Sequence, residues 1–131
     1  MIEQVKFLSP EWEKLMKDSL KAEFCKKGGV TTEFMQVVEG CPDGTSKWML
    51  FKIKKSTYVS YEVGEGEQPE AEFKAFAPYE IFQKVILKEL DGSKALINGK
   101  FKLKGNMMKA MGLIGIYNRV EKVQRAIPTI F

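Results

Sequence analysis

The stretch GKFKLKGNMMKAM, residues 99–111, constrains the fold more than any other part of the chain. Its first half alternates lysines with Phe101 and Leu103, which predicts a short strand with one apolar and one charged face. Gly105 allows a turn, and Asn106 can cap the following helix by accepting a backbone N–H bond. Three methionines then gather on one side of that helix: Met107, Met108 and Met111. Because methionine is flexible and polarisable, such a surface adapts to apolar ligands of variable shape.

Outward from this stretch, hydrophobic periodicity and turn residues predict both helices and strands. Ser9 and Pro10 open the first helix as N-cap and first helical residue. The expected elements are a helix from Pro10 that ends at 26–29, strands at 30–39, 47–54, 57–63 and 71–77, a helix at 78–90, a helical turn at 93–98, a strand at 100–104 and a helix at 107–126. Strands joined by short turns predict an antiparallel meander. Gly112 and Gly115 in the last helix indicate close packing, a kink or a thinned wall beside a ligand.

Length and charge limit the classes of partner. The chain has 131 residues, which suits one compact domain over 1–131, and a formal net charge of +4. A nucleic-acid binder concentrates its basic residues on one face, whereas here only two lysine groups are clustered, so no nucleic-acid partner is expected. The two groups are at positions 52, 54 and 55 and at positions 100, 102 and 104. Either they are solvated strand edges, or they steer the protein towards anionic lipid head groups in a transient contact with a membrane surface.

The residue inventory argues against an enzyme and against a metal site. There is no histidine, and the two cysteines, Cys25 and Cys41, form no Cys-x-x-Cys pair, which excludes the usual zinc sites and histidine-based catalytic groups. No carboxylate lies in a recognisable catalytic motif, and no cofactor is expected. The N-terminal residues 1–7 lack the features of a signal peptide, and no apolar run is long enough to span a membrane, so we expect a cytoplasmic protein.

Residues 72–111 resemble the sterol carrier protein-2 (SCP-2) lipid-binding family. The similar segments are FKAFAPYEIF at 73–82, LDGSKALING at 90–99 and the stretch quoted above, with Trp48 at another common position. The resemblance implies an α+β domain with a five-stranded, mostly antiparallel sheet, covered on one face by helices around an internal hydrophobic tunnel. It also implies a non-catalytic protein that binds and transfers fatty acids, fatty acyl-CoA, sterols or phospholipids.

From this resemblance we expect twelve residues to contribute to lipid binding, although each could equally be ordinary core. They are Trp48, Leu50, Phe82, Val85, Ile86, Phe101, Leu103, Met107, Met108, Met111, Ile114 and Tyr117. Met108 stands where the family often has a small glycine, which predicts a narrower tunnel that favours fatty acid or acyl-CoA over sterol. We expect a monomer or weak dimer.

Three roles are open for the apolar C-terminal segment 127–131. It could cover the cavity as a lid, or it could simply pack on a helix. It could also be a partner contact, in which case the protein would be an accessory domain that docks onto a lipid-metabolising enzyme.

Overall fold

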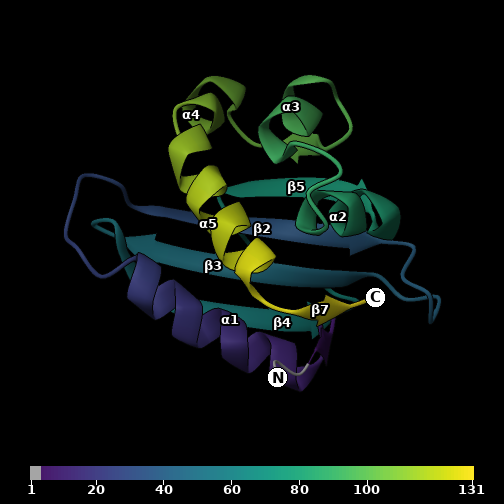
Figure 1. Ribbon diagram of the computed structural model, residues 1–131. Helices are drawn as coiled ribbons and strands as arrows, with labels where there is room; N and C mark the ends of the chain where they lie inside the picture. Colours follow the sequence, from purple (N-terminus) through teal and green to yellow (C-terminus); the bar gives the residue numbers. More distant parts are fainter. Residues whose placement is uncertain (1–3) are drawn as a thin grey trace.

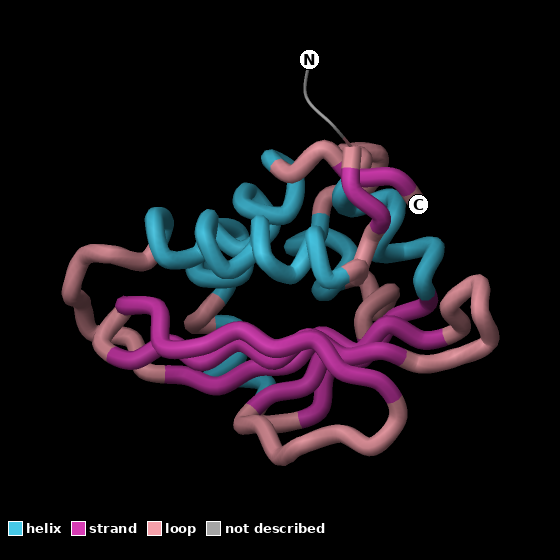
Figure 2. The backbone as a smooth tube through the Cα atoms, turned by 90° about the horizontal axis from the view of Figure 1, so that it is seen from below, coloured by secondary structure: helices cyan, strands magenta, loops and turns pink. Residues whose placement is uncertain are grey.

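A five-stranded sheet with helices on one face forms the body of the protein (Figures 1 and 2). The computed structural model describes residues 4–131, so the first three residues of the N-terminal segment discussed above lie outside the described part. The strands are β2 (Thr32–Glu39), β3 (Lys47–Lys54), β4 (Thr57–Glu65), β5 (Phe73–Pro78) and β6 (Lys102–Lys104). Their order across the sheet is β4-β3-β2-β5-β6. The expected α+β fold with a five-stranded sheet is therefore confirmed.

One pair of strands departs from the meander. The pairs β2–β3, β3–β4 and β5–β6 are antiparallel, but β2 and β5 are parallel. Because β4 is an edge strand, the chain must cross the sheet to reach β5, and the loop that follows β4 does so on the face opposite the helices (Figure 2). A local turn pattern cannot predict this crossover, since only the position of β5 beside β2 requires it.

The crossing loop explains a second apolar cluster on that outer face. Met35, Val37 and Leu50 are buried there, with Trp48 packed against them. The indole Nε1 of Trp48 donates a hydrogen bond of 3.0 Å to the carbonyl oxygen of Glu67 in the loop. This face of the sheet is therefore a small core of its own, separate from the interior under the helices.

Within residues 4–131, five helices lie on or beside the other face: α1 (Pro10–Glu23), α2 (Tyr79–Ile86), α3 (Gly92–Ile97), α4 (Met107–Met111) and α5 (Ile114–Ala126). The predicted start of α1 is confirmed, because the Ser9 side chain accepts a hydrogen bond from the backbone N–H of Trp12. The helix predicted at 78–90 was too long. It ends at Ile86, and Lys88 adopts a positive φ of 65°, which an α-helix does not accommodate.

The helix predicted at 107–126 is broken in two. α4 ends at Met111 and α5 begins at Ile114, so of the alternatives drawn from its glycines the structure has a kink. At the break, the backbone N–H of Leu113 bonds to the carbonyl oxygen of Ala110, a tighter i→i−3 turn than the α-helical pattern. Because the helix is interrupted here, α4 does not continue the buried face of α5.

The C-terminal segment is built into the fold. β7 (Thr129–Ile130) pairs in parallel with β1 (Val5–Lys6), and the Phe131 ring lies 5.1 Å from that of Phe7. Ile127 is buried. The segment therefore packs as a structural element, and only Ile130 of its large apolar side chains is exposed.

Candidate functional site

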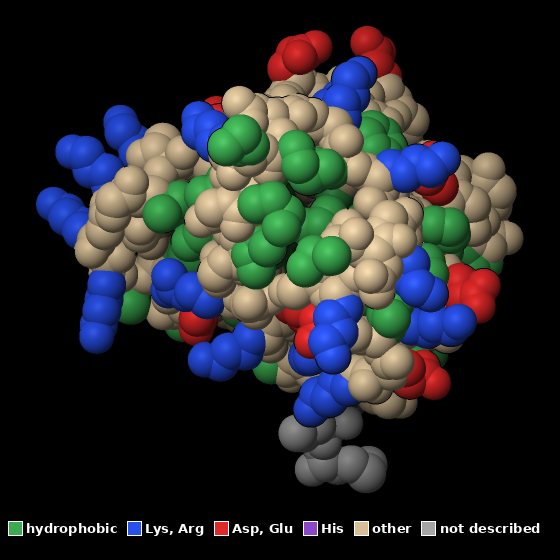
Figure 3. Space-filling view, turned by 90° about the horizontal axis from the view of Figure 1, so that it is seen from above, with side chains coloured by type: hydrophobic (Ala, Val, Ile, Leu, Met, Phe, Trp, Pro, Cys, Tyr) green, Lys and Arg blue, Asp and Glu red, His purple; other side chains and the backbone are tan. Residues whose placement is uncertain are grey.

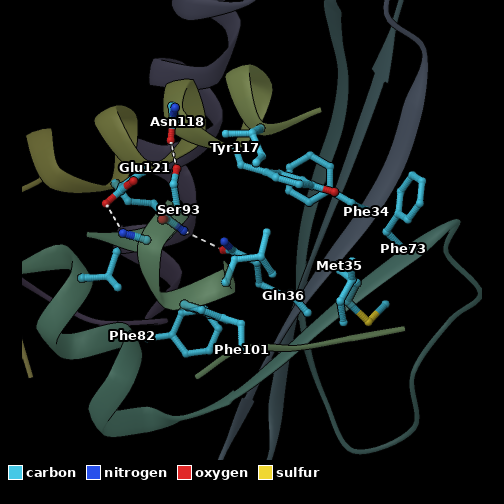
Figure 4. A pocket seen from close by; sticks show the side chains of 17 residues that line it. Phe34, Met35, Gln36, Phe73, Phe82, Ser93, Phe101, Tyr117, Asn118 and Glu121 are labelled. Atoms are coloured by element: carbon cyan, nitrogen blue, oxygen red, sulfur yellow. Dashed lines mark hydrogen bonds between the residues drawn. The ribbon is translucent and has the colours of Figure 1, made fainter. Parts of the chain in front are cut away.

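A cavity of about 60 Å³ lies between the sheet and helices α2, α3 and α5 (Figure 4). Its position under the helices agrees with the expected location of the ligand space, but its volume is far smaller than a tunnel. The lining residues are Phe34, Met35, Gln36, Phe73, Ala75, Phe82, Val85, Gly92, Ser93, Leu96, Phe101, Leu103, Ile114, Tyr117, Asn118, Glu121 and Gln124.

Aromatic rings from different elements form the apolar walls. Phe82 of α2 meets Phe101 edge to face at 5.2 Å, and Phe34 of β2 meets Tyr117 of α5 in the same way at 5.0 Å. Leu103 of β6 pairs with Ala75 on the helix-covered face of β5. Phe101 lies two residues before Leu103, and alternate residues of a strand point to the same face, so Phe101 also reaches the interior. Such rings give large apolar contact areas and fixed directions, so the walls are mostly rigid.

A cluster of polar groups closes the side of the cavity between α3 and α5. The hydroxyl of Ser93 donates to the side-chain oxygen of Asn118 at 2.5 Å, and the backbone N–H of Gly92 donates to the Glu121 carboxylate at 3.2 Å. Arg125 forms an ion pair with Glu121 at 2.6 Å. Burial raises the pKa of Glu121, and the Gly92 N–H and Arg125 act in the opposite direction. Among the described residues, Glu121 is the only lining residue with a carboxylate or a basic group.

Two glutamines bridge the sheet and α5 inside the cavity. Gln124 is 2% exposed, and its amide nitrogen donates to the side-chain oxygen of Gln36 at 2.8 Å. Gln36 lies in the central strand between Phe34 and Val38, which are almost fully buried, yet it is itself partly accessible. The pair therefore adds neutral polar atoms to an otherwise apolar wall.

The Tyr117 hydroxyl is a further polar group beside the cavity. It is buried without a hydrogen-bond partner among the residues that the structure describes. Burial, with a smaller effect of Glu72, raises the pKa of Tyr117 to about 12, so the phenol is neutral at physiological pH. A buried, unpaired hydroxyl costs free energy unless a ligand or water atom bonds to it.

A shallow groove outside the polar cluster continues the cavity towards solvent. The two share Ser93, Ile114, Asn118 and Glu121. Its other walls carry four basic side chains, those of Lys88, Lys94, Lys122 and Arg125, with Asp91, Ile97 and Ala126. We call this the basic groove. We call the wall formed by these four shared residues the mouth of the cavity, because a ligand that entered from the basic groove would have to pass between them.

Six of the twelve predicted site residues line the cavity: Phe82, Val85, Phe101, Leu103, Ile114 and Tyr117. Ile86, which follows Val85 on α2, does not line the cavity. It is buried in the main hydrophobic core. Trp48 and Leu50 do not line the cavity either, since they lie in the outer cluster. Residues alternate along β3, so Met49 and Phe51 face the helices while Trp48 and Leu50 face away.

The three methionines lie outside the cavity lining as well. Met107, Met108 and Met111 are 54%, 87% and 39% exposed. The physical reason is that α4 is a helix of only five residues, Met107–Met111, and buries only Ala110. The Met108 side chain therefore does not narrow this cavity.

The polar residues of the site were missed by sequence reasoning. A usable signal was present for two of them, because Gln36 interrupts the apolar face of its strand and Gln124 lies on the buried face of its helix with Val120 and Val123. For Ser93, Asn118 and Glu121 there was none, since their meeting depends on how α3 packs against α5.

Two other features are relevant among residues 4–131, a metal-binding cluster and a membrane-spanning helix. Residues 4–131 hold no group of three or more metal-ligating side chains, and both Cys25 and Cys41 are free thiols. None of the helices in this range has the length and hydropathy needed to cross a bilayer.

Comparison with known proteins gives a family match and several structural relatives. The profile of the SCP-2 sterol transfer family matches residues 34–118. The fold is similar to a crystal structure of sterol carrier protein 2, with a TM-score of 0.77 and 18% identity over 93% of this chain and 99% of that one. It is also similar to a Thermus thermophilus protein described as possibly a sterol carrier protein, with a TM-score of 0.70 and 17% identity over 99% and 97% of the two chains.

A third relative is a palmitated SCP2L2 from Aedes aegypti, with a TM-score of 0.54 and 18% identity over 79% of this chain and 91% of that one. At these identities, the structural likenesses establish the fold alone. A comparison of the sequence with curated proteins gives no match.

Proposed function

Because the chain belongs to the SCP-2 sterol transfer family, we propose that it binds one lipid molecule and carries it without chemical change. The apolar part of the lipid would occupy the cavity under the helices, whose walls are Phe82, Phe101 and their neighbours. The observation that carries this proposal is the cavity itself. An ordinary interior is packed densely, and a space beside six of the predicted residues is where a ligand would enter.

The cavity favours a flexible acyl chain over a rigid sterol. Its volume of about 60 Å³ is below the roughly 150 Å³ of an engineered apolar cavity that takes benzene. Any lipid must therefore displace side chains, and a chain that bends needs smaller displacements than a fused ring system. One structural relative is palmitated, which agrees with an acyl ligand.

The charges favour an acidic head group held outside the cavity. Inside, the Glu121 carboxylate would repel an anion, and none of the described lining residues is basic. Outside, the basic groove offers Lys88 and Lys94, which form no ion pair within residues 4–131. We therefore favour a fatty acid or a fatty acyl-CoA, with its carboxylate or phosphates in the groove and its chain through the mouth.

The binding energy of such a ligand comes mainly from its chain. Each buried methylene contributes about 0.8 kcal/mol, so about ten methylenes give roughly 8 kcal/mol before binding costs. That gross value corresponds to a Kd of about 1 μM, which the cost of opening the cavity raises. A reversible affinity of this size suits a carrier, which must release what it binds.

The alternative role is docking onto a lipid-metabolising enzyme, and the structure removes the main argument for it. It rested on a free C-terminal segment, and that segment is paired with β1 and packed on Phe7. We retain binding and transfer, by a monomer or weak dimer that touches membranes transiently, as the proposed function.

Filling the cavity tests this function. Ala75 lines the cavity from β5, so Ala75→Leu should lower the affinity for a fluorescent fatty acid at least tenfold. Ala22, exposed on α1, provides the matched control, and Ala22→Leu should leave the affinity within twofold. Native mass spectrometry of the purified protein should also show a co-purified lipid. Equal affinity in both variants would refute binding in this cavity.

A further inference from the structure

Four large apolar side chains gather on the face that carries α3 and α4. They are Ile97, Met107, Met108 and Met111, and we call them the methionine patch. They are 64%, 54%, 87% and 39% exposed, and they make up half of the eight exposed large hydrophobic residues of the described chain. Figure 3 shows this face, with hydrophobic side chains near its centre and lysines or arginines around them. A clustered patch, unlike scattered apolar residues, indicates an interaction surface.

The patch adjoins the mouth of the cavity. Ile97 of the patch also lines the basic groove, and Leu96, its neighbour on α3, lines the cavity. On the other side, α4 leads across its break to Ile114, which lines both. A surface that covers the patch therefore also lies over the opening through which a lipid would pass.

Lysines flank the patch on the same segments. Lys94 lies on α3, Lys109 on α4, and Lys100, Lys102 and Lys104 belong to the chain segment that connects the two helices, all of them exposed. Only Lys109 is neutralised, by an ion pair with Glu72; the other four form no ion pair within residues 4–131. Apolar side chains with unpaired cations beside them complement an anionic lipid surface.

We propose that the methionine patch docks the protein on anionic phospholipid bilayers, with the mouth of the cavity facing the membrane. The methionines enter the boundary between head groups and acyl chains, and the lysines contact the lipid phosphates. A bilayer fits better than a protein partner, because protruding, unbranched side chains on a five-residue helix offer neither a groove nor a fixed pattern of hydrogen bonds. The inference rests on the proposed lipid transfer, since docking is where the ligand would be exchanged.

Vesicle co-sedimentation tests the docking surface without any ligand. We expect the protein to bind vesicles of phosphatidylcholine with about 30% phosphatidylglycerol at least fivefold more tightly than vesicles of phosphatidylcholine alone. Met108→Glu should weaken binding to the anionic vesicles at least fivefold. Val59→Glu is the matched control, because Val59 is 50% exposed on β4, and it changes the net charge equally. It should alter binding less than twofold.

A second pair of variants tests the lysines. Lys100→Gln with Lys104→Gln should weaken binding to the anionic vesicles about tenfold. Lys26→Gln with Lys27→Gln, in the loop that follows α1, should have less than half that effect. All four side chains are exposed, so circular dichroism should show intact folds.

Three results would overturn the docking inference: no preference for anionic vesicles, equal effects of Met108→Glu and Val59→Glu, or a dimer that Met108→Glu dissociates without changing vesicle binding. The last would make the patch a contact between two copies. Each leaves the proposed function intact if the fluorescent fatty acid still binds in solution. Conversely, loss of fatty-acid binding in Ala75→Leu does not bear on vesicle binding by the empty protein.

Discussion

Truncation of Phe101 should both destabilise the protein and widen the cavity. The ring is 8% exposed and packs edge to face on Phe82 at 5.2 Å. A buried Phe→Ala change costs about 3–5 kcal/mol. Because one side of this ring already faces empty space, it has fewer contacts to lose, and we expect Phe101→Ala to cost about 3 kcal/mol.

The expected fall in the thermal midpoint follows from the chain length. A chain of 131 residues has an unfolding entropy of about 275 cal/mol/K near the midpoint, at about 2.1 cal/mol/K per residue. A loss of about 3 kcal/mol then lowers the midpoint by about 11 °C. Scanning calorimetry measures this value directly.

The wider cavity should also change ligand preference. We expect the affinity of Phe101→Ala for a fluorescent sterol, divided by its affinity for a fluorescent fatty acid, to rise at least fivefold. Phe24→Ala is the control, because Phe24 is 1% exposed and packs under the Arg119 guanidinium, away from the cavity lining. It should destabilise the protein at least as much and leave the ratio unchanged. If the ratio moves equally in both variants, or in neither, the cavity does not select the ligand.

Three further predictions concern stability. The pKa of Glu121 is raised in the folded state, so the contribution of this group to stability is complete below the ordinary value of 4.5 and declines as the pH rises above it. Relative to Glu121→Gln, the wild type should therefore lose stability in denaturant titrations as the pH is raised from about 4.5. Deletion of residues 128–131 should lower the thermal midpoint, because β7 pairs with β1. The release rate of a fluorescent fatty acid should not change, because these residues line no part of the cavity. Faster release with an unchanged midpoint would support the lid hypothesis instead. Gly64→Ala should cost about 1–3 kcal/mol, because a Cβ there would overlap the Trp48 ring; a cost below about 0.5 kcal/mol would show that the indole moves freely.

The sequence by itself determined the local elements. Ser9 and Pro10 specify the start of α1, the alternation around Phe101 and Leu103 predicts the inward face of β6, and the resemblance at 72–111 identifies the family. These features depend on neighbouring residues, whose side chains and hydrogen bonds act within a turn or a strand.

Only the tertiary structure decided the site. Alternation separated Trp48 and Leu50 from Met49, but it could not say which of the two faces the helices cover. The kink that places the methionines outside depends on where α5 packs, and the bond between Gln36 and Gln124 joins positions 88 residues apart. Such contacts are set by the global packing of β2 against β5 and α5, because burial and long-range pairing, not local spacing, determine which side chains share one cavity.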